Sequence, residues 1–251
     1  MKSSYLLKTL LAGAILGTSY LPNAYAAFSF GTNSSEIQYV TMNASDVGQS
    51  FTANWLCSAN TTCGNSGTTP NTLSATGKFT LDSYTSTGLT LSATIKNTTS
   101  SSFQAALMSI GISAPALTPS WGTAGSVFTR IGSGGGGNFP GGFKNINSCI
   151  YSGSKCSGTN IKNGLGDGNA NTNPLSTDSF KFILASNSGT IGSSVTLSDF
   201  AVKFQTSAGS YEFGDGLGPS PTPEPASFWL LGSALLFMIG IHLRKGMPKK
   251  A

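Results

Sequence analysis

The sequence predicts an all-β protein, an antiparallel β-sandwich of the immunoglobulin-like or jelly-roll type. Apolar and polar residues alternate along several short segments, and turn-forming residues separate nearly all of these segments. The region between residues 27 and 213 has no convincing helical period, so we expect no crossover helices and no parallel sheet. The alternation is clearest in four sets: Phe51, Ala53 and Trp55; Leu89, Leu91, Ala93 and Ile95; Phe180, Phe182 and Leu184; and Phe200, Val202 and Phe204.

Further strands are expected in five segments with weaker alternation. About nine strands in all would suffice for a sandwich of one domain. The segment FQAALMSIGI (103–112) is compatible with one helical turn as well as with a strand. The strand order does not follow from the pattern. The five segments are 36–42, 73–81, 103–112, 126–131 and 143–151.

Residues 1–26 have the layout of a secretory signal peptide. Lys2 and Lys8 precede an apolar run at residues 10–16, and the small residues Ala24 and Ala26 precede Ala27. The apolar run is too short to cross a bilayer comfortably. We therefore expect signal peptidase to cleave before Ala27 and the β-sandwich domain, 27–213, to lie outside the cytoplasm.

The C-terminal part of the chain predicts a membrane segment. Residues 226–243 form an apolar run that spans roughly 27 Å at ~1.5 Å per residue, close to the hydrocarbon thickness of a bilayer. The basic tail 244–251 should remain on the cytoplasmic side. A Gly/Pro-rich spacer, 214–225, would connect the domain to this transmembrane helix.

Pro223, Glu224 and Pro225, followed by one apolar helix and a basic cluster, resemble the PEP-CTERM sorting signal of Gram-negative bacteria. The resemblance implies a precursor held in the inner membrane. It also implies recognition and cleavage by an exosortase-type membrane enzyme, followed by delivery to the cell surface or an exopolysaccharide matrix. The region between Cys149 and Gln205 is similar to the cistern-family subgroup of such proteins, which carries no established activity.

The charge of the exported part argues against a nucleic-acid partner. The whole chain has 14 Lys and Arg against 9 Asp and Glu, a net charge of +5. Six of the basic residues lie in the two terminal targeting segments, so residues 27–225 carry 8 basic and 9 acidic residues, a net charge of −1. A body this close to neutral has no overall electrostatic attraction for a phosphate backbone.

Four cysteines lie in the part of the chain that we expect to be exported, where disulfides form readily. Three pairings are possible. We favour the local ones, Cys57 with Cys63 and Cys149 with Cys156, because each pair brackets a turn rich in Gly, Asn and Ser. A zinc site is the alternative, but the spacings are wrong and the body has no histidine.

The single histidine, His242, lies in the expected transmembrane segment. Its position excludes Ser-His-Asp and Cys-His catalysis, and histidine-based metal sites, from the exported body. Paired carboxylates could still cleave a glycosidic bond, but no acid lies in a recognisable motif. We therefore expect no catalytic residues and no enzyme activity, with a two-carboxylate glycan hydrolase as the distant alternative.

One loop has the residue spacing of a calcium site. Its last candidate ligand falls at the twelfth position, where a closing carboxylate belongs. The sixth position is Thr172 instead of glycine, and no helices flank the loop, so we expect an ordinary Asx-rich loop without metal or other cofactor. Calcium remains the alternative. The candidate ligands are Asp167, Asn169, Asn171 and Asp178.

These arguments predict an exported, non-enzymatic surface or extracellular-matrix protein associated with exopolysaccharide or biofilm. The alternative is a carbohydrate-binding module of the matrix. Four aromatic residues in or beside Gly-rich loops would serve that alternative by stacking on sugars, unless they cover the edge of the sandwich. They are Trp121, Phe139, Phe143 and Tyr151.

Overall fold

The computed structural model describes residues 28–219, except residues 65, 134–138, 140–142, 144 and 159. The described residues up to Gly218 form one compact unit. The expected signal peptide (1–26), transmembrane segment (226–243) and basic tail (244–251) lie outside the described residues. Within the described part of the chain, no helix combines the length and the apolar character needed to cross a membrane.

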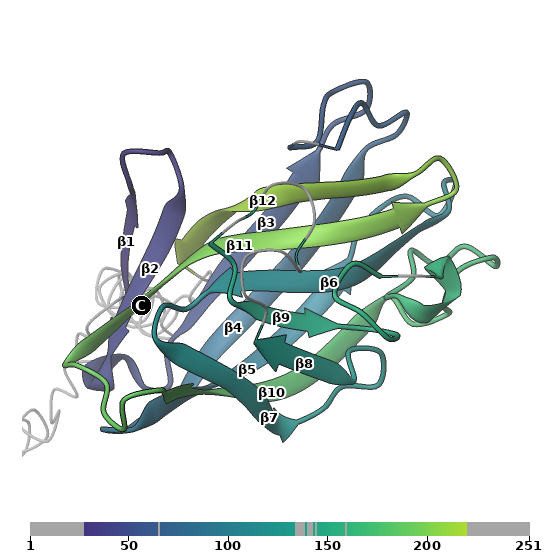
Figure 1. Ribbon diagram of the computed structural model, residues 1–251. Coiled ribbons are helices and arrows are strands. Elements are labelled where there is room, and N and C mark those ends of the chain that lie inside the picture. The colour runs from purple at the N-terminus through teal and green to yellow at the C-terminus, as the bar shows by residue number, and fades with distance from the viewer. Residues whose placement is uncertain are drawn as a thin grey trace, which may run out of the picture. The chain divides into compact units, whose positions relative to one another are not determined.

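Twelve strands of the described residues form two antiparallel sheets (Figure 1). The first sheet has the order β7 (Leu117–Thr123), β10 (Thr177–Ser186), β5 (Gly88–Asn97), β4 (Leu73–Tyr84) and β3 (Ser50–Cys57). The second has the order β12 (Ser210–Pro219), β11 (Ser194–Thr206), β6 (Ala105–Ser113), β9 (Ser148–Tyr151) and β8 (Arg130–Ser133), and is extended by β2 (Gln38–Asn43) and β1 (Ser29–Thr32). The predicted all-β sandwich is confirmed, while its narrower type, immunoglobulin-like or jelly-roll, stays a prediction.

The two sheets are continuous along one edge, because β3 is hydrogen-bonded to β12. The long strand β11 organises the second sheet. On one side its first residues pair with β2 and its last residues pair with β12, while β6 runs along its other side. Two short 3-10 helices, η1 (Ala44–Asp46) and η2 (Ile161–Asn163), lie in the connections.

The core between the sheets is centred on three phenylalanines. Phe51 of β3 stacks on Phe79 of β4 with 5.1 Å between ring centroids. Both rings meet Phe200 of β11 edge to face, at 5.6 and 5.4 Å. All three are fully buried, so this cluster joins the inner faces of the two sheets.

The indole of Trp55 requires a glycine on the neighbouring strand. Trp55 is buried and donates its Nε1–H to the carbonyl oxygen of Phe200, at 3.0 Å. Its ring covers Gly77 so closely that a Cβ there would lie 2.7 Å from Cη2 of Trp55. A side chain at residue 77 would therefore displace the indole and disturb its hydrogen bond across the sandwich.

The four clearest alternating segments are confirmed as β3, β5, β10 and β11, with the predicted apolar residues buried. The segment 103–112 forms strand β6 and not a helical turn. The predicted strands 126–131 and 143–151 are shorter than expected, since β8 begins at Arg130 and β9 begins at Ser148.

Strands β1, β7 and β12 were not predicted. Strand β7 contains Pro119, which cannot donate a hydrogen bond to a neighbouring strand and which reads as a turn former. It is tolerated because β7 is the terminal strand of the first sheet. Strand β12 continues to Pro219, so residues 214–219, which we assigned to the spacer, belong to a strand. Tyr211 and Phe213 begin an alternation of apolar and polar residues, but the glycines that follow them carry no side chains that could continue it.

Candidate functional site

The outer face of the second sheet is covered by a small apolar cluster. It packs closely on β6, because a Cβ at Gly111 would lie 2.6 Å from Cδ1 of Ile146 and 2.9 Å from Cδ2 of Phe139. This face of the sheet is thus shielded from solvent by connecting segments. We call the following buried residues the cover cluster: Phe139, Ile146, Cys149, Cys156 and Ala201.

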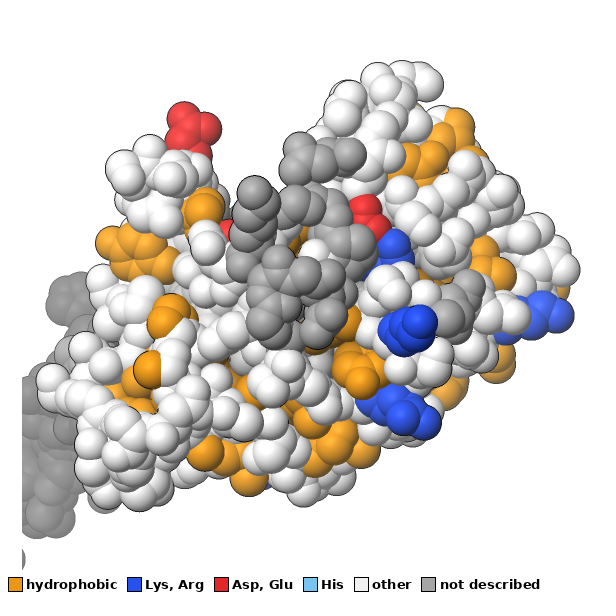
Figure 2. All heavy atoms as spheres, in the orientation of Figure 1, with side chains coloured by type: hydrophobic (Ala, Val, Ile, Leu, Met, Phe, Trp, Pro, Cys, Tyr) orange, Lys and Arg blue, Asp and Glu red, His pale blue; other side chains and the backbone are white. Residues whose placement is uncertain are grey.

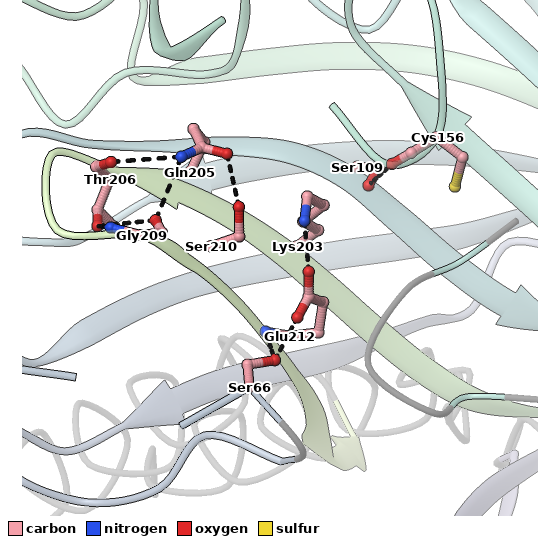
Figure 3. Close-up of polar contacts among 9 residues, drawn as sticks. All are labelled: Ser66, Ser109, Cys156, Lys203, Gln205, Thr206, Gly209, Ser210 and Glu212. Carbon is pink, nitrogen blue, oxygen red and sulfur yellow. Dashed lines mark hydrogen bonds and ion pairs between the residues drawn. The ribbon is translucent and has the colours of Figure 1, made fainter. Parts of the chain in front are cut away.

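A buried ion pair joins β11 and β12 in the second sheet. Lys203 and Glu212 lie directly opposite each other in the strand register, each with 4% of its surface exposed. The Lys203 ammonium contacts Oε1 of Glu212, and the Ser66 hydroxyl donates to Oε2 (Figure 3). The Glu212 backbone N–H donates back to Ser66 Oγ at 2.9 Å. The loop after β3 is thereby docked on β12.

The turn between β11 and β12 fixes the strand register that places Lys203 directly opposite Glu212. The Thr206 hydroxyl oxygen accepts the Gly209 N–H at 3.0 Å, and the Ser210 hydroxyl donates to Gln205 Oε1 at 2.7 Å (Figure 3). Gly209 has a φ of +152°, which a residue with a side chain rarely adopts. These hydrogen bonds are all made within the β11–β12 hairpin, so these polar groups stabilise the turn.

Both local disulfide pairings are confirmed. Cys57 is bonded to Cys63 with 5.7 Å between Cα atoms, and Cys149 is bonded to Cys156 with 6.2 Å. The first disulfide joins the end of β3 to Cys63, three residues before Ser66. The second belongs to the cover cluster and so holds a segment against the second sheet.

In the loop with the spacing of a calcium site, the Asp167 carboxylate accepts hydrogen bonds from the surrounding loop. Its Oδ2 accepts the Ala105 N–H at 2.9 Å, and its Oδ1 accepts the Asn169 N–H and the Thr172 hydroxyl, both at 2.9 Å. Asn169 in turn caps the Asn171 N–H at 2.9 Å. These contacts give the Asp167 carboxylate a structural role in ordering the loop.

Asp178 serves a different turn. Its two carboxylate oxygens accept the N–H groups of Ser126, Val127, Phe128 and Ser179 at 2.8–3.0 Å. Among the described residues, no three His, Cys, Asp or Glu side chains lie close enough to share a metal ion. The structure therefore gives Asp167 and Asp178 the same role in two separate turns, that of ordering the backbone.

Three further carboxylates also have structural partners. Asp82 accepts the Ser92 hydroxyl at 2.6 Å and contacts Lys181 Nζ at 2.8 Å. Although burial acts to raise its pKa, these two partners hold the pKa of Asp82 below its ordinary value. Asp46 accepts the Asn43 N–H at 2.8 Å in the capping box of η1. At Asp199, burial raises the pKa despite a hydrogen bond with Asn145.

The candidate sugar-stacking aromatics do not form an exposed platform. Phe139 is buried and meets Phe143 edge to face at 5.8 Å. Trp121 meets Phe180 edge to face at 5.7 Å, and Tyr151 is half-buried against the cover cluster. Phe139 is thus part of the cover, while Trp121, Phe143 and Tyr151 are each half-buried, and sugar stacking by these rings stays a prediction.

A polar groove of about 530 Å³ lies between the start of β8 and the connections on either side of η2. Arg130 opens β8 opposite Tyr151, and the Asn160 side chain positions Lys162 by accepting its backbone N–H at 2.9 Å. We call this the basic groove. It is lined by Ser126, Val127, Thr129, Arg130, Gly153, Ser154, Lys162, Asn163 and Asn173.

The basic groove was missed by the sequence reasoning. Its residues come from three connections, from η2 and from the first residue of β8, and they form no motif. The net charge of the exported part is −1. A local charge count would have given a signal, because the chain has no acid between Asp82 and Asp167. Five basic residues lie in that interval: Lys96, Arg130, Lys144, Lys155 and Lys162.

The sorting and cleavage residues predicted from the sequence lie outside the described residues. They are Pro223, Glu224 and Pro225, and Ala24, Ala26 and Ala27. The narrower resemblance to the cistern-family subgroup finds no support, and neither a curated protein nor a solved structure matches the chain.

The C-terminal segment does match a known motif, the PEP-CTERM protein-sorting motif, over residues 221–245. The match includes the Pro-Glu-Pro residues and extends to Lys245. Such a signal is carried by exported proteins that are anchored in the membrane before an exosortase, a membrane enzyme, processes them. The predicted resemblance is thereby confirmed, and the chain is identified as an exported protein that carries a PEP-CTERM sorting signal.

Proposed function

We propose that the protein is a non-enzymatic component of the bacterial surface or extracellular matrix, associated with exopolysaccharide. The observation that carries the proposal is the sorting signal at residues 221–245, which follows a body built as one disulfide-bonded β-sandwich. A body that is delivered outside the cell has to persist without chaperones. Its rigid turns and disulfides suit that requirement.

The absence of enzyme activity is supported by how the carboxylates are used. Glycoside cleavage needs one carboxyl group free to donate a proton and a second one facing the same bond. Asp167 and Asp178 instead bind backbone N–H groups, while Glu212 and Asp82 bind lysines. Each would have to break a structural contact before acting as an acid or a base.

An association with hydrated polymers is supported by the outer face of the first sheet. Short hydroxyl side chains follow its strands, and several pair across them, as Ser50 does with Thr80 at 2.7 Å and Thr94 with Ser179 at 3.0 Å. The residues that alternate with the core here are polar or exposed. Such a face is compatible with a water-rich matrix, although Leu56 of β3 is an exposed apolar side chain on it.

Intact-mass spectrometry of the protein recovered from native culture tests the proposal. We expect a species without residues 1–26, truncated near Pro223 to Pro225, and lighter than the reduced chain by the hydrogens lost in two disulfides. A variant with Pro223→Ala and Pro225→Ala should keep its C-terminus and accumulate in the membrane fraction. Full-length protein with reduced thiols in the cytosol would contradict the proposal.

A further inference from the structure

The positive charges of the sandwich are unevenly distributed. Figure 2 shows several Lys and Arg side chains on the side of the molecule that carries β8 and β9, with an acidic side chain beside one of them and another at the β1–β2 hairpin. Arg130, Lys155 and Lys162 are all exposed. The near-neutral net charge therefore conceals a locally basic surface, and the basic groove lies within it.

The two cations of the basic groove have no carboxylate partner within the described part of the chain. The ion pairs found there are Lys181 with Asp82 and Lys203 with Glu212. One buried carboxylate, that of Asp178, lies next to the groove wall. The Asp178 carboxylate accepts the backbone N–H groups of Ser126 and Val127, two residues that line the groove. Its negative charge is therefore paired with N–H groups of the groove wall and does not neutralise Arg130 or Lys162.

We propose that the basic groove binds an acidic sugar unit of a carboxylated polysaccharide. The Arg130 guanidinium can hold a carboxylate through two parallel hydrogen bonds, and the Lys162 ammonium adds a second positive charge. The hydroxyl and amide groups of Ser154, Asn163 and Asn173 can donate to and accept from sugar hydroxyls. This inference rests on the proposed association with exopolysaccharide and names the site and the charge class of the ligand.

A saccharide fits the basic groove better than a nucleic acid does. Proteins that bind single-stranded nucleic acids use exposed aromatic rings on which bases stack, and the groove lining contains none. Binding of a duplex requires a longer series of phosphate contacts than two cations provide. Hydroxyls, amides and a pair of cations in one concave surface match a polyhydroxylated anion.

Isothermal titration calorimetry of the full-length chain in a neutral detergent tests the inference, with alginate as the carboxylated probe. We expect alginate to bind, with an affinity that decreases as salt is added because the attraction between charges is screened. Uncharged dextran should not bind. The double variant Arg130→Gln, Lys162→Gln should lose affinity for alginate by about tenfold or more, since two charge-assisted contacts are removed.

The matched control is the double variant Lys78→Gln, Lys96→Gln. It removes the same charge from exposed positions on β4 and β5 of the first sheet. The control should bind alginate within about twofold of the unaltered chain, and both variants should keep its melting temperature. Equal losses in the two variants, no alginate binding, or tighter binding of a single-stranded DNA oligonucleotide would each overturn the inference. Because this measurement is independent of processing, the mass-spectrometry test of the proposed function can fail or succeed separately.

Discussion

The outer face of the first sheet is open to solvent, whereas that of the second sheet is covered, and the two ion pairs show this difference in exposure. On the first sheet, Lys181 and Asp82 form a pair that remains accessible, with 44% and 25% of their side chains exposed. On the second sheet, Lys203 and Glu212 form a pair with 5% and 6% exposed, beneath the Ser66 loop. Each pair joins different strands of one sheet, so strand pairing alone does not determine how deeply a charge is buried.

The energetic roles of the two pairs should differ accordingly. An exposed pair gains little, because water already solvates both charges and salt screens them. A buried pair costs free energy to desolvate, so each charge depends on the other once the loop is docked. The comparison teaches that the second sheet is stabilised by its cover as well as by the core, whereas the first sheet depends on the core alone.

The largest expected effect is that of Glu212→Gln. It keeps the shape of the side chain but leaves the Lys203 ammonium buried without a counter-charge, which should lower the free energy of unfolding by about 3–5 kcal/mol. Urea unfolding of the full-length chain measures it. The double variant Lys203→Met, Glu212→Leu is the control and should be closer to the unaltered chain. A loss no larger than that of an exposed pair would refute the difference between the sheets.

Removal of the Cys149–Cys156 disulfide should have the next largest effect. The variant Cys149→Ala, Cys156→Ala frees a loop with a sequence separation of 7. Chain entropy alone predicts a loss of about 2 kcal/mol, and the cover cluster loses packing in addition. Urea unfolding would measure the loss of stability, and limited proteolysis should reveal new cleavage sites between β8 and η2.

The Cys57–Cys63 disulfide, with a separation of 6, provides the comparison at nearly equal loop length. An unchanged unfolding midpoint and unchanged cleavage would argue against a stabilising cover.

The smallest expected effect is that of Lys181→Met in the exposed pair. We expect a loss of at most about 1 kcal/mol at neutral pH, reduced further by added salt. Because the folded-state pKa of Asp82 is lowered, its contribution is present above the usual value of 3.8 and is lost as the pH falls through the folded-state value. The difference between variant and unaltered chain should thus disappear in acid. A difference that grows as the pH is lowered from neutral would contradict this assignment.

The same contrast explains which strands could be predicted. The first sheet has one solvated face, so β3, β4, β5 and β10 alternate in sequence and were located from that alternation. Strand β6 is buried at every residue because the cover shields its outer face, and its sequence therefore lacks a period of two. Strand β12 was assigned in part to a spacer, since its glycines carry no side chains that could alternate.

The candidate sites divide in a similar way. The disulfide pairs and the sorting signal are local features, a few residues apart in sequence, and both were predicted correctly. The spacing of Asp167 and Asp178 was also local, but the structure places backbone N–H groups around each carboxylate. The basic groove combines side chains from Ser126 to Asn173, and no short window contains its pattern.

By itself, the sequence determined four of the five strands of the first sheet, all but β7, together with the two disulfides and the sorting signal. These features depend on neighbouring residues, through the alternation of side chains, the closure of short loops and a contiguous motif. The tertiary structure alone decided which sheet face is covered, that Lys203 and Glu212 are buried together, and that Arg130 and Lys162 line one groove. Those outcomes depend on pairing between distant strands and on the docking of loops, because burial and electrostatic environment arise only when distant segments come together.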